Sequence, residues 1–443
     1  MNNQLPDNIK KYLEKYSSGK WKVYSKNNKF NSIVIIPAID EFENIKTLLS
    51  SLIKNDAEYF STTLILFVVN QLTSSSIDIK QNNFKTIEYL RNIINKKNHE
   101  DDLSKMVINS KLQIGLIDAS SEGFEFDNKD GGVGLARKIG MDEALKFFNY
   151  NSSNKNLLIC LDADCTVSEN YISTIRKNFD QHNLHAAYLN FSHEKTNVEE
   201  NNLAIINYEI FLRYYVLGLK YAGSPYAYHS IGSTMVCDVE SYIKIQGMNK
   251  RKAAEDFYFM EKLSKITDIK RINGATVYPS SRGSWRVPFG TGKRVTRFLE
   301  KVQNEYLLYA PIMFSVLKNW IELFNSEEIL SAQNYLTQAG EISKSLFDFL
   351  INSKFEENWN NIIKNSNSNN QVMKQKQLWF DGFKTLKLIH FLRDSGSPSI
   401  NMFDALDQMF EMMNIPFNYQ NEIGEIPSVI IQEEYLQVLR KIA

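Results

Sequence analysis

The sequence predicts an α/β protein in which a doubly wound, mainly parallel sheet with a mixed edge is followed by a helical C-terminal module. Three observations predict this fold. Short apolar runs alternate with segments of helical periodicity over the first part of the chain, and polar residues follow the ends of successive apolar runs. Beyond about residue 293 the helical periodicity continues almost without strand signals.

The regular pattern begins after a polar N-terminal stretch, residues 5–30, which reads as a short amphipathic helix and a tether. Residues 32–36 form a continuous apolar run, typical of a parallel strand buried on both faces, and we expect Pro37 to end its pairing. Apolar residues then recur on one helical face over 44–54. The same alternation predicts further strands at 64–69, 112–117 and 156–161, and helices at 84–94 and 135–148.

Beyond residue 185 the order changes, which predicts the mixed edge of the sheet. We expect strands at 185–191, 233–237 and 275–278. An aromatic-rich helix at 202–221 carries a stripe that indicates core packing, with sugar contact as the alternative. The stripe consists of Tyr208, Phe211, Leu212, Tyr215 and Leu219.

The remaining segments with helical periodicity are 295–309, 329–350 and 403–413, with the Asn-rich stretch 356–371 as the linker candidate. The predicted organisation is an N-terminal helix and tether over 1–29, a sheet domain over 30–295 and a helical region over 296–443. Oligomerisation through the C-terminal helices is the role that we rank first for the last region.

Composition excludes several classes of protein. Lys and Arg together number 51, as do Asp and Glu, so no net field attracts nucleic acid. The three cysteines, Cys160, Cys165 and Cys237, lack the spacing of a zinc cluster and the even number of a disulfide framework. With no apolar run of about 18 residues and no secretory signal, we expect a cytoplasmic protein, at most peripheral at the inner face of a membrane.

Two carboxylates follow the predicted strand at 156–161, in the sequence Asp162-Ala163-Asp164. Side chains two residues apart in extended chain point the same way, so both carboxylates can share one cation. Such hard oxygen ligands suit Mn²⁺ or Mg²⁺, which keep waters and bridge protein carboxylates to substrate phosphate. Because ligands bind beyond the carboxyl ends of parallel strands, this position favours a metal site over a solvated turn.

Residues 35–45 resemble the opening strand and turn of the family 2 glycosyltransferases, which have the GT-A fold. The resemblance implies that the backbone at Pro37 and Ala38 and the side chain of Glu41 contact the nucleoside of a sugar nucleotide. The family usually has Tyr-Asn where this chain has Ile39-Asp40, so stacking of the base on that tyrosine is not implied.

Asn70 stands where the second strand of the family commonly ends in an acidic residue that reads the base. An amide donates as well as accepts hydrogen bonds, so the base stays open. Asp118, after the third strand, is a further candidate for contact with the donor. Residues 134–144 resemble the family's glycine-led helix, and Arg137 on that helix would face the diphosphate or the nucleoside.

Gly247-Met248 leads into Ala254-Glu255-Asp256-Phe257, which resembles the family's acidic pair at a helix start. The resemblance implies that Asp256 is the general base for an acceptor hydroxyl and that Glu255 orients the acceptor or a basic group. The alternative is an acidic first turn that complements the helix dipole.

Two further segments are candidates. Residues 280–292 contain Arg282 and Arg286 among glycines and suit a loop that closes over the phosphates of the donor, with an ordinary surface loop as the alternative. His229 is a candidate third metal ligand or acceptor contact, and a hydrogen-bonded structural histidine is equally consistent with the sequence.

The resemblance, which covers residues 30–295, implies a bacterial-type, hexosyltransferase-like enzyme. It would transfer a sugar from a nucleoside-diphosphate sugar to a hydroxyl of a glycan, a lipid-linked acceptor or a small molecule, with Mn²⁺ or Mg²⁺ and with inversion. Two alternatives remain. A nucleotidyltransferase would normally carry a glycine-rich basic loop after the first strand, which residues 37–44 lack. A non-catalytic sugar-nucleotide-binding scaffold would be favoured by loss of an acidic motif residue, and none is missing.

Overall fold

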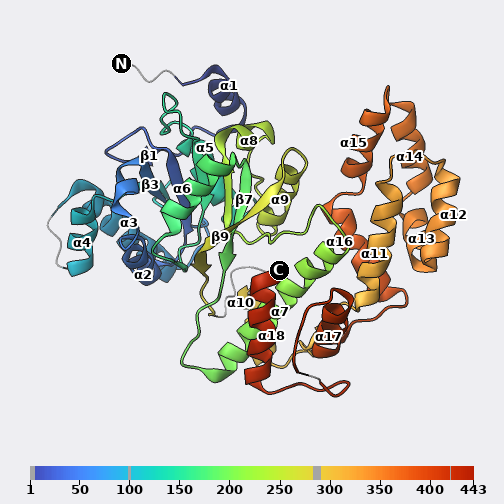
Figure 1. Cartoon of the computed structure of the whole chain (residues 1–443). Coiled ribbons are helices and arrows are strands. Elements are labelled where there is room, and N and C mark those ends of the chain that lie inside the picture. Colours follow the sequence, from blue (N-terminus) through green and yellow to red (C-terminus); the bar gives the residue numbers. More distant parts are fainter. Residues whose placement is uncertain (1–4, 98–100, 283–290, 420) are drawn as a thin grey trace. The chain divides into compact units, whose positions relative to one another are not determined.

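A computed structural model of the chain describes residues 5–97, 101–282, 291–419 and 421–443 (Figure 1). Its internal contacts divide it into two compact units. The first unit contains the described residues up to 195 together with 230–281. The second contains 196–229, residue 282 and the described residues from 291 onward.

The first unit is built on one mixed sheet, as the sequence predicts. In spatial order its strands are β1 (Val23–Tyr24), β4 (Gln113–Ala119), β3 (Thr63–Asn70), β2 (Ser32–Ala38), β5 (Leu157–Cys160), β8 (Met235–Asp238), β7 (Ala186–Phe191), β9 (Ile269–Tyr278) and β6 (Thr166–Val167). The four strands β4, β3, β2 and β5 are parallel to one another. Antiparallel pairing of β8 with β5 and with β7 forms the predicted mixed edge.

Helices cover both faces of this sheet because its central strands are apolar on both sides. The helices of the first unit are α1 (Asp7–Tyr16), α2 (Phe42–Leu52), α3 (Ile77–Asn95), α4 (Asp102–Ser110), α5 (Val133–Ala144), α6 (Tyr171–His182), α8 (Val239–Lys244) and α9 (Glu255–Ser264), with a 3₁₀ turn at Ala57–Thr62. Val34 and Ile36 of β2 lie in the core that α2, α3 and α6 complete. The intervening Ile35 points to the other face, where α5 approaches it at Gly140.

The predicted end of β2 at Pro37 is wrong. The strand continues to Ala38, with Pro37 opposite Val68 and Ala38 opposite Val69 of β3. A proline lacks one backbone donor but keeps its carbonyl, so one residue near a strand end interrupts the ladder little.

The parallel strands bring the predicted polar residues to one edge. At the carboxyl ends of β2, β3, β4 and β5 lie four polar residues, each within two positions of the last strand residue: Asp40, Asn70, Asp118 and Asp162. In an open α/β sheet this edge is the usual place for a ligand.

The N-terminal helix α1 is anchored rather than a free tether. The Tyr12 hydroxyl donates to Asp142 of α5 at 2.8 Å, and the Tyr242 hydroxyl of α8 donates to the same carboxylate at 2.7 Å. Lys138 also donates to Asp142, at 2.8 Å. Residues 23–24 of the predicted tether form the edge strand β1, antiparallel to β4.

The second unit is almost entirely helical, as predicted. Its elements are α7 (Glu199–Tyr221), α10 (Thr291–Leu299), β10 (Leu307–Leu308), α11 (Pro311–Phe324), α12 (Ala332–Ile342), α13 (Lys344–Asn352), α14 (Phe355–Lys364), α15 (Asn369–Trp379), α16 (Gly382–Asp394), β11 (Ile400–Asn401), α17 (Met402–Met412) and α18 (Val429–Ile442). The predicted helix at 295–309 ends early, at Leu299, and the one at 329–350 is divided into α12 and α13.

The aromatic-rich helix α7 packs with the C-terminal helices. Its buried Glu209 accepts from Arg213 at 2.9 Å and from Arg440 of α18 at 2.7 Å. Its Lys220 donates to the carbonyl of Ile442 at 2.8 Å. These bonds tie the first and last helices of the second unit to each other.

The Asn-rich stretch 356–371 is not a linker. Most of it belongs to α14 and to the start of α15, and its asparagines are largely exposed. Phe355 and Trp359 are buried in the core of the unit, with their rings stacked 6.1 Å apart. Two large aromatic anchors therefore outweigh the polar composition of the segment.

Among the described residues, no helix is long and apolar enough to span a bilayer.

A pair of glycine substitutions tests the packing of α5 on the sheet. A Cβ at Gly140 would lie 2.5 Å from Ile35 Cγ2 and 2.9 Å from Val68 Cγ2. Gly140→Ala should therefore destabilise the first unit by about 1–3 kcal/mol, despite the better helix propensity of alanine.

Gly340→Ala in α12 is the matched control, because the nearest contact of its new Cβ would be Phe347 at 3.9 Å. This change should stabilise its helix by about 0.5–1 kcal/mol. Hydrogen exchange of α5 and α12 under increasing denaturant measures both effects. Equal stabilisation by both substitutions would contradict the close approach of α5 to the sheet.

Candidate active site

The first unit contains most of the residues that the sequence predicts for the site. They are Pro37, Ala38, Glu41, Asn70, Asp118, Arg137, Asp162, Ala163, Asp164, Glu255 and Asp256. His229 and Arg282 belong to the second unit. Arg286 lies outside the described residues.

The acidic motif directly follows β5 and alternates in burial. Asp162 and Asp164 are partly exposed, whereas Ala163 and Cys165 are buried. The backbone turns immediately, since the amide of Cys165 donates to the carbonyl of Asp162 at 3.2 Å. The alternation keeps both carboxylates partly at the surface while the small residues pack into the core.

The predicted acidic pair occupies the first turn of α9. Glu255 is buried and Asp256 is partly exposed. Ala254, which precedes the helix, has φ +57°, a left-handed conformation that an alanine rarely adopts. The side-chain amide of Asn249 donates to the carbonyl of Glu255 at 2.9 Å and supports the turn. Local backbone strain of this kind is often found at functional sites.

Arg137 of α5 joins the two acidic motifs. Its Nη2 donates to Oδ1 of Asp162 and its Nη1 donates to Oε1 of Glu255. Only 3% of its side chain is exposed, against 5% for Glu255 and 35% for Asp162. Burial lowers the pKa of Arg137, but the charges of Asp162 and Glu255 outweigh burial and raise it above its ordinary value. The planar guanidinium thus fixes the end of β5 against the start of α9.

Two glycines allow this close approach. A Cβ at Gly232 would lie 2.3 Å from Nη2 of Arg137, so the chain before β8 lies directly against the guanidinium. A Cβ at Gly134 would lie 2.2 Å from the carbonyl of Arg251 and 3.0 Å from Cβ of Glu255. A side chain at Gly134 would push the acidic helix and its preceding loop away from α5, and one at Gly232 would displace the guanidinium of Arg137.

The carboxyl group of Asp256 has a raised pKa. Burial, followed by the nearby negative charge of Glu255, raises the pKa of Asp256 to about 7, although Arg137 lowers it. A carboxylate with this pKa can accept a proton near neutral pH, which is the property required of a general base.

The turn after β2 is held by asparagines from α3. Asp40 has φ +57°, and its amide donates to Oδ1 of Asn83 at 2.9 Å. The amide of Phe42 donates to Oδ1 of Asn82 at 3.1 Å. Between them, the predicted nucleoside contact Glu41 is buried, and it accepts from the side chain of Asn44.

Asn70 and Asp118 make hydrogen bonds to the ends of their own strands and to neighbouring elements. The Asn70 amide donates to the carbonyls of Ala38 at 3.2 Å and Val68 at 3.1 Å. Oδ1 of Asp118 accepts from the amides of Ser120 and Ser121 at 3.1 and 2.9 Å, and its Oδ2 accepts from Arg91 at 3.0 Å. Both side chains therefore shape the edge on which a nucleotide would lie.

Sequence reasoning missed several residues that support the site. For one of them, Asn83, the sequence pattern does indicate a buried polar role. It occupies the apolar stripe of α3 with Ile87 and Leu90, where a polar residue indicates a buried hydrogen bond. Its side chain donates to the carbonyl of Asn70 at 3.0 Å in addition to accepting from Asp40. Gly232 had no comparable signal, because its contact with Arg137 depends on the fold.

Comparisons with known proteins leave the family open. No protein-family model matches the chain, and no curated protein matches it. The solved structures that it resembles include TarS of S. aureus, at 14% identity and a TM-score of 0.37, over 78% of this chain and 55% of that chain. TarS 1–349 with UDP-GlcNAc gives 14% identity and a TM-score of 0.37, over 78% of this chain and 91% of that chain.

The same fragment with UDP gives 13% identity and a TM-score of 0.37, over 84% of this chain and 97% of that chain. The chain therefore spans just over half the length of full TarS. At these scores the likeness assigns neither family nor activity, so a function has to follow from the residues of the site.

Proposed function

We propose that the first unit is a glycosyltransferase that moves a sugar from a nucleoside-diphosphate sugar to an acceptor hydroxyl. The observation that carries this proposal is the bridge from Arg137 to Asp162 and Glu255. It joins the acidic motif after β5 to the acidic pair of α9, and the polar turn after β2 lies at the same edge of the sheet.

The charges of the site fit a divalent cation. Asp162, Glu255 and Asp256 share the field of one guanidinium, that of Arg137, so the cluster carries excess negative charge. In the described part of the chain, no group of three or more His, Cys, Asp and Glu side chains is placed to hold a metal. Asp162 and Asp164 would hold Mn²⁺ or Mg²⁺ with water and diphosphate oxygens as the other ligands. When bound, the cation would stabilise the charge of the departing nucleoside diphosphate.

The other residues have separate roles. The carboxylate of Asp256 takes the proton of the acceptor hydroxyl as its oxygen forms a bond to the anomeric carbon. The bond from that carbon to the diphosphate oxygen breaks on the opposite side, and the nucleoside diphosphate leaves. Arg137 holds Asp162 and Glu255 in place, and the turn at Glu41 contacts the nucleoside. Direct displacement of this kind inverts the configuration at the anomeric carbon.

The first experiment measures release of nucleoside diphosphate from a panel of sugar nucleotides, with Mn²⁺, with Mg²⁺ and with chelator. One donor should give metal-dependent release, which Asp164→Asn should lower by at least about a hundredfold because a metal ligand is lost. Asp268→Asn is the matched control, since the Asp268 side chain is 83% exposed and forms an exposed ion pair with Lys270 at 3.1 Å. The control should keep full activity.

Two results would contradict the proposal. One is that no sugar nucleotide raises the unfolding temperature of the protein, even with metal. The other is release of pyrophosphate from a nucleoside triphosphate and a sugar phosphate, the product of a nucleotidyltransferase.

The second experiment measures kcat/KM against pH. If Asp256 is the general base, kcat/KM should rise about tenfold per pH unit below 7 and level off above it, since only the ionised carboxylate accepts a proton. Asp256→Asn should lower the plateau about 10²- to 10⁴-fold and remove the slope.

Glu255→Gln removes the like charge that contributes to the raised pKa, so it should shift the midpoint to lower pH. Glu240→Gln, an exposed change on α8, is the control and should leave the midpoint in place. A pH profile of Asp256→Asn that keeps the wild-type slope would assign the base to another residue.

A further inference from the structure

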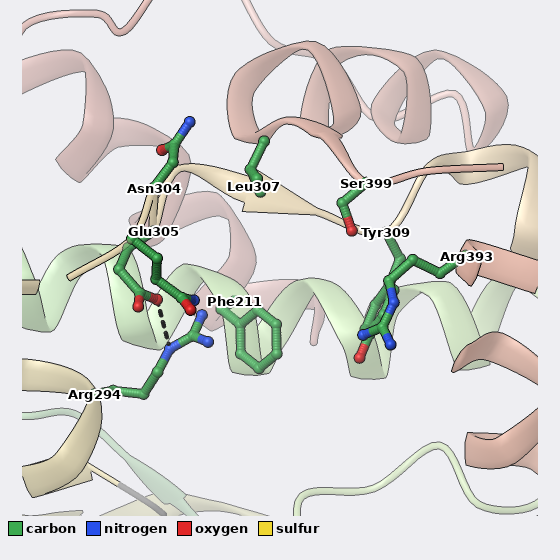
Figure 2. Close-up of a pocket in the computed structure, with 9 residues that line it drawn as sticks. Phe211, Arg294, Asn304, Glu305, Leu307, Tyr309, Arg393 and Ser399 are labelled. Carbon is green, nitrogen blue, oxygen red and sulfur yellow. Dashed lines mark ion pairs between the residues drawn. The ribbon is translucent and has the colours of Figure 1, made fainter. Parts of the chain in front are cut away.

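The second unit contains a pocket of its own, with a volume of about 190 Å³ (Figure 2). Phe211 of α7 lies at its centre in this view, with Arg294 of α10 on one side and Arg393 of α16 on the other. Gln303, Tyr309 and Ser399 also line it. This volume lies below the roughly 300–1,000 Å³ of pockets that hold drug-sized ligands, so the pocket suits one small organic ring rather than a larger ligand.

One wall of the pocket is fixed by a buried carboxylate. Glu305, with 2% of its side chain exposed, forms an ion pair with Nε of Arg294 at 3.1 Å and another with Arg297. Its carbonyl accepts from the side chain of Asn207 at 3.1 Å. The guanidinium carbon of Arg294 lies 4.2 Å from the centre of the Phe211 ring. These contacts orient Arg294 and Phe211 before any ligand arrives.

The opposite wall is fixed by Tyr309. Its hydroxyl is hydrogen-bonded to Nε2 of His390 at 2.9 Å, and its carbonyl accepts from the hydroxyl of Tyr214 at 2.6 Å. The antiparallel pair of β10 and β11 holds the chain just before Tyr309 beside the chain just after Ser399. A cavity with walls held this firmly costs little ordering free energy when a ligand binds.

The lining combines aromatic faces with groups that donate and accept hydrogen bonds. The rings of Phe211 and Tyr309 lie 6.2 Å apart at 42°. Gln303 and Ser399 add an amide and a hydroxyl to the same pocket. A sugar ring has this mixed character, because its C–H face packs on aromatic rings while its hydroxyls both donate and accept.

The charges around the pocket favour a ligand with one negative charge. Arg294 and Arg297 share Glu305, and Arg393 pairs with Asp394, so three guanidinium groups face two carboxylates. The side chains of Arg393 and Asp394 are 37% and 63% exposed. Asp394 accepts from Nε and Nη2 of Arg393 at 2.7 and 3.0 Å, and a guanidinium carries further N–H donors, so Arg393 can bind an anionic group of the ligand beside Asp394 or in its place.

We propose that this pocket binds a single sugar ring that carries one carboxylate or phosphate group. The ring packs on Phe211 and Tyr309, its hydroxyls bond to Gln303 and Ser399, and the acidic group pairs with Arg393. The site lies within the second unit and is independent of the transferase activity proposed for the first, since its test is binding without turnover.

Titration calorimetry on the full chain at pH 7 and low ionic strength tests the proposal. The probes are glucuronic acid and glucose 6-phosphate, with methyl glucoside as the neutral sugar and acetate and inorganic phosphate as the anions alone. At least one acidic sugar should bind about tenfold more tightly than the neutral sugar and than either anion. Which one binds better distinguishes a carboxylate from a phosphate ligand.

Two variants locate the binding site. Arg393→Gln should reduce the affinity for the acidic sugar about tenfold, to the level of the neutral one. Lys387→Gln is the matched control, because this exposed lysine lies on the same helix, α16, and does not line the pocket. Ser399→Trp should fill the cavity and abolish binding of both sugars, with the unfolding temperature checked to confirm that the chain is folded.

Three outcomes would overturn the proposal. They are no binding of either acidic sugar, acidic-sugar affinity that Arg393→Gln leaves unchanged, and binding of acetate or phosphate as tight as that of the acidic sugars. Binding that survives Ser399→Trp in a folded chain would likewise place the sugar elsewhere.

Discussion

The site of the first unit depends on one buried guanidinium. Arg137 holds a carboxylate from the end of β5 and another from the start of α9. Without it, Glu255 would be a buried charge with its main counter-charge removed, and breaking such a pair typically costs about 3–5 kcal/mol. Gly134 and Gly232 allow the approach because a Cβ at either would overlap its neighbours. The close packing at these two glycines and the ion pairs of Arg137 therefore hold β5 and α9 together at the site.

Much of the fold follows from local pattern. Runs such as 32–36 and 64–69 are apolar on both faces, and only a strand covered on both sides by helices buries them completely. The errors arise where a few residues outweigh composition. Burial of Phe355 and Trp359 stabilises a helix in a segment whose Asn-rich composition predicts a linker. Likewise, Pro37 does not end β2, because the strand continues to Ala38. Sequence spacing likewise does not show that α7 packs with α18, because the bonds of Glu209 join residues far apart in the chain.

The motifs of the site could be predicted from the sequence, but the hydrogen-bond partners of each side chain could not. The paired aspartates after β5 and the acidic start of α9 follow from residue type and position. Arg137 joins them because α5 crosses the sheet at this point, and no local sequence pattern predicts that crossing. The predicted direct contacts of Asn70 and Asp118 with a nucleotide remain a proposal. In the structure, both also support the backbone of the strand ends that would receive it.

The arginines of the two units have opposite functions because their burial differs. Arg137 is 3% exposed and serves two carboxylates. Burial, followed by the charge of Glu255, raises the pKa of Asp256 to about 7, and Arg137 offsets this rise only in part. The packing that assembles the site thereby leaves one carboxylate basic enough to take a proton near neutral pH. Arg393 is 37% exposed beside an exposed Asp394, so solvent screens its two-bond pair far more than it screens the buried pair of Arg137 and Glu255. The buried arginine thus organises the proposed catalytic site, and the exposed one is the proposed contact for an anionic ligand.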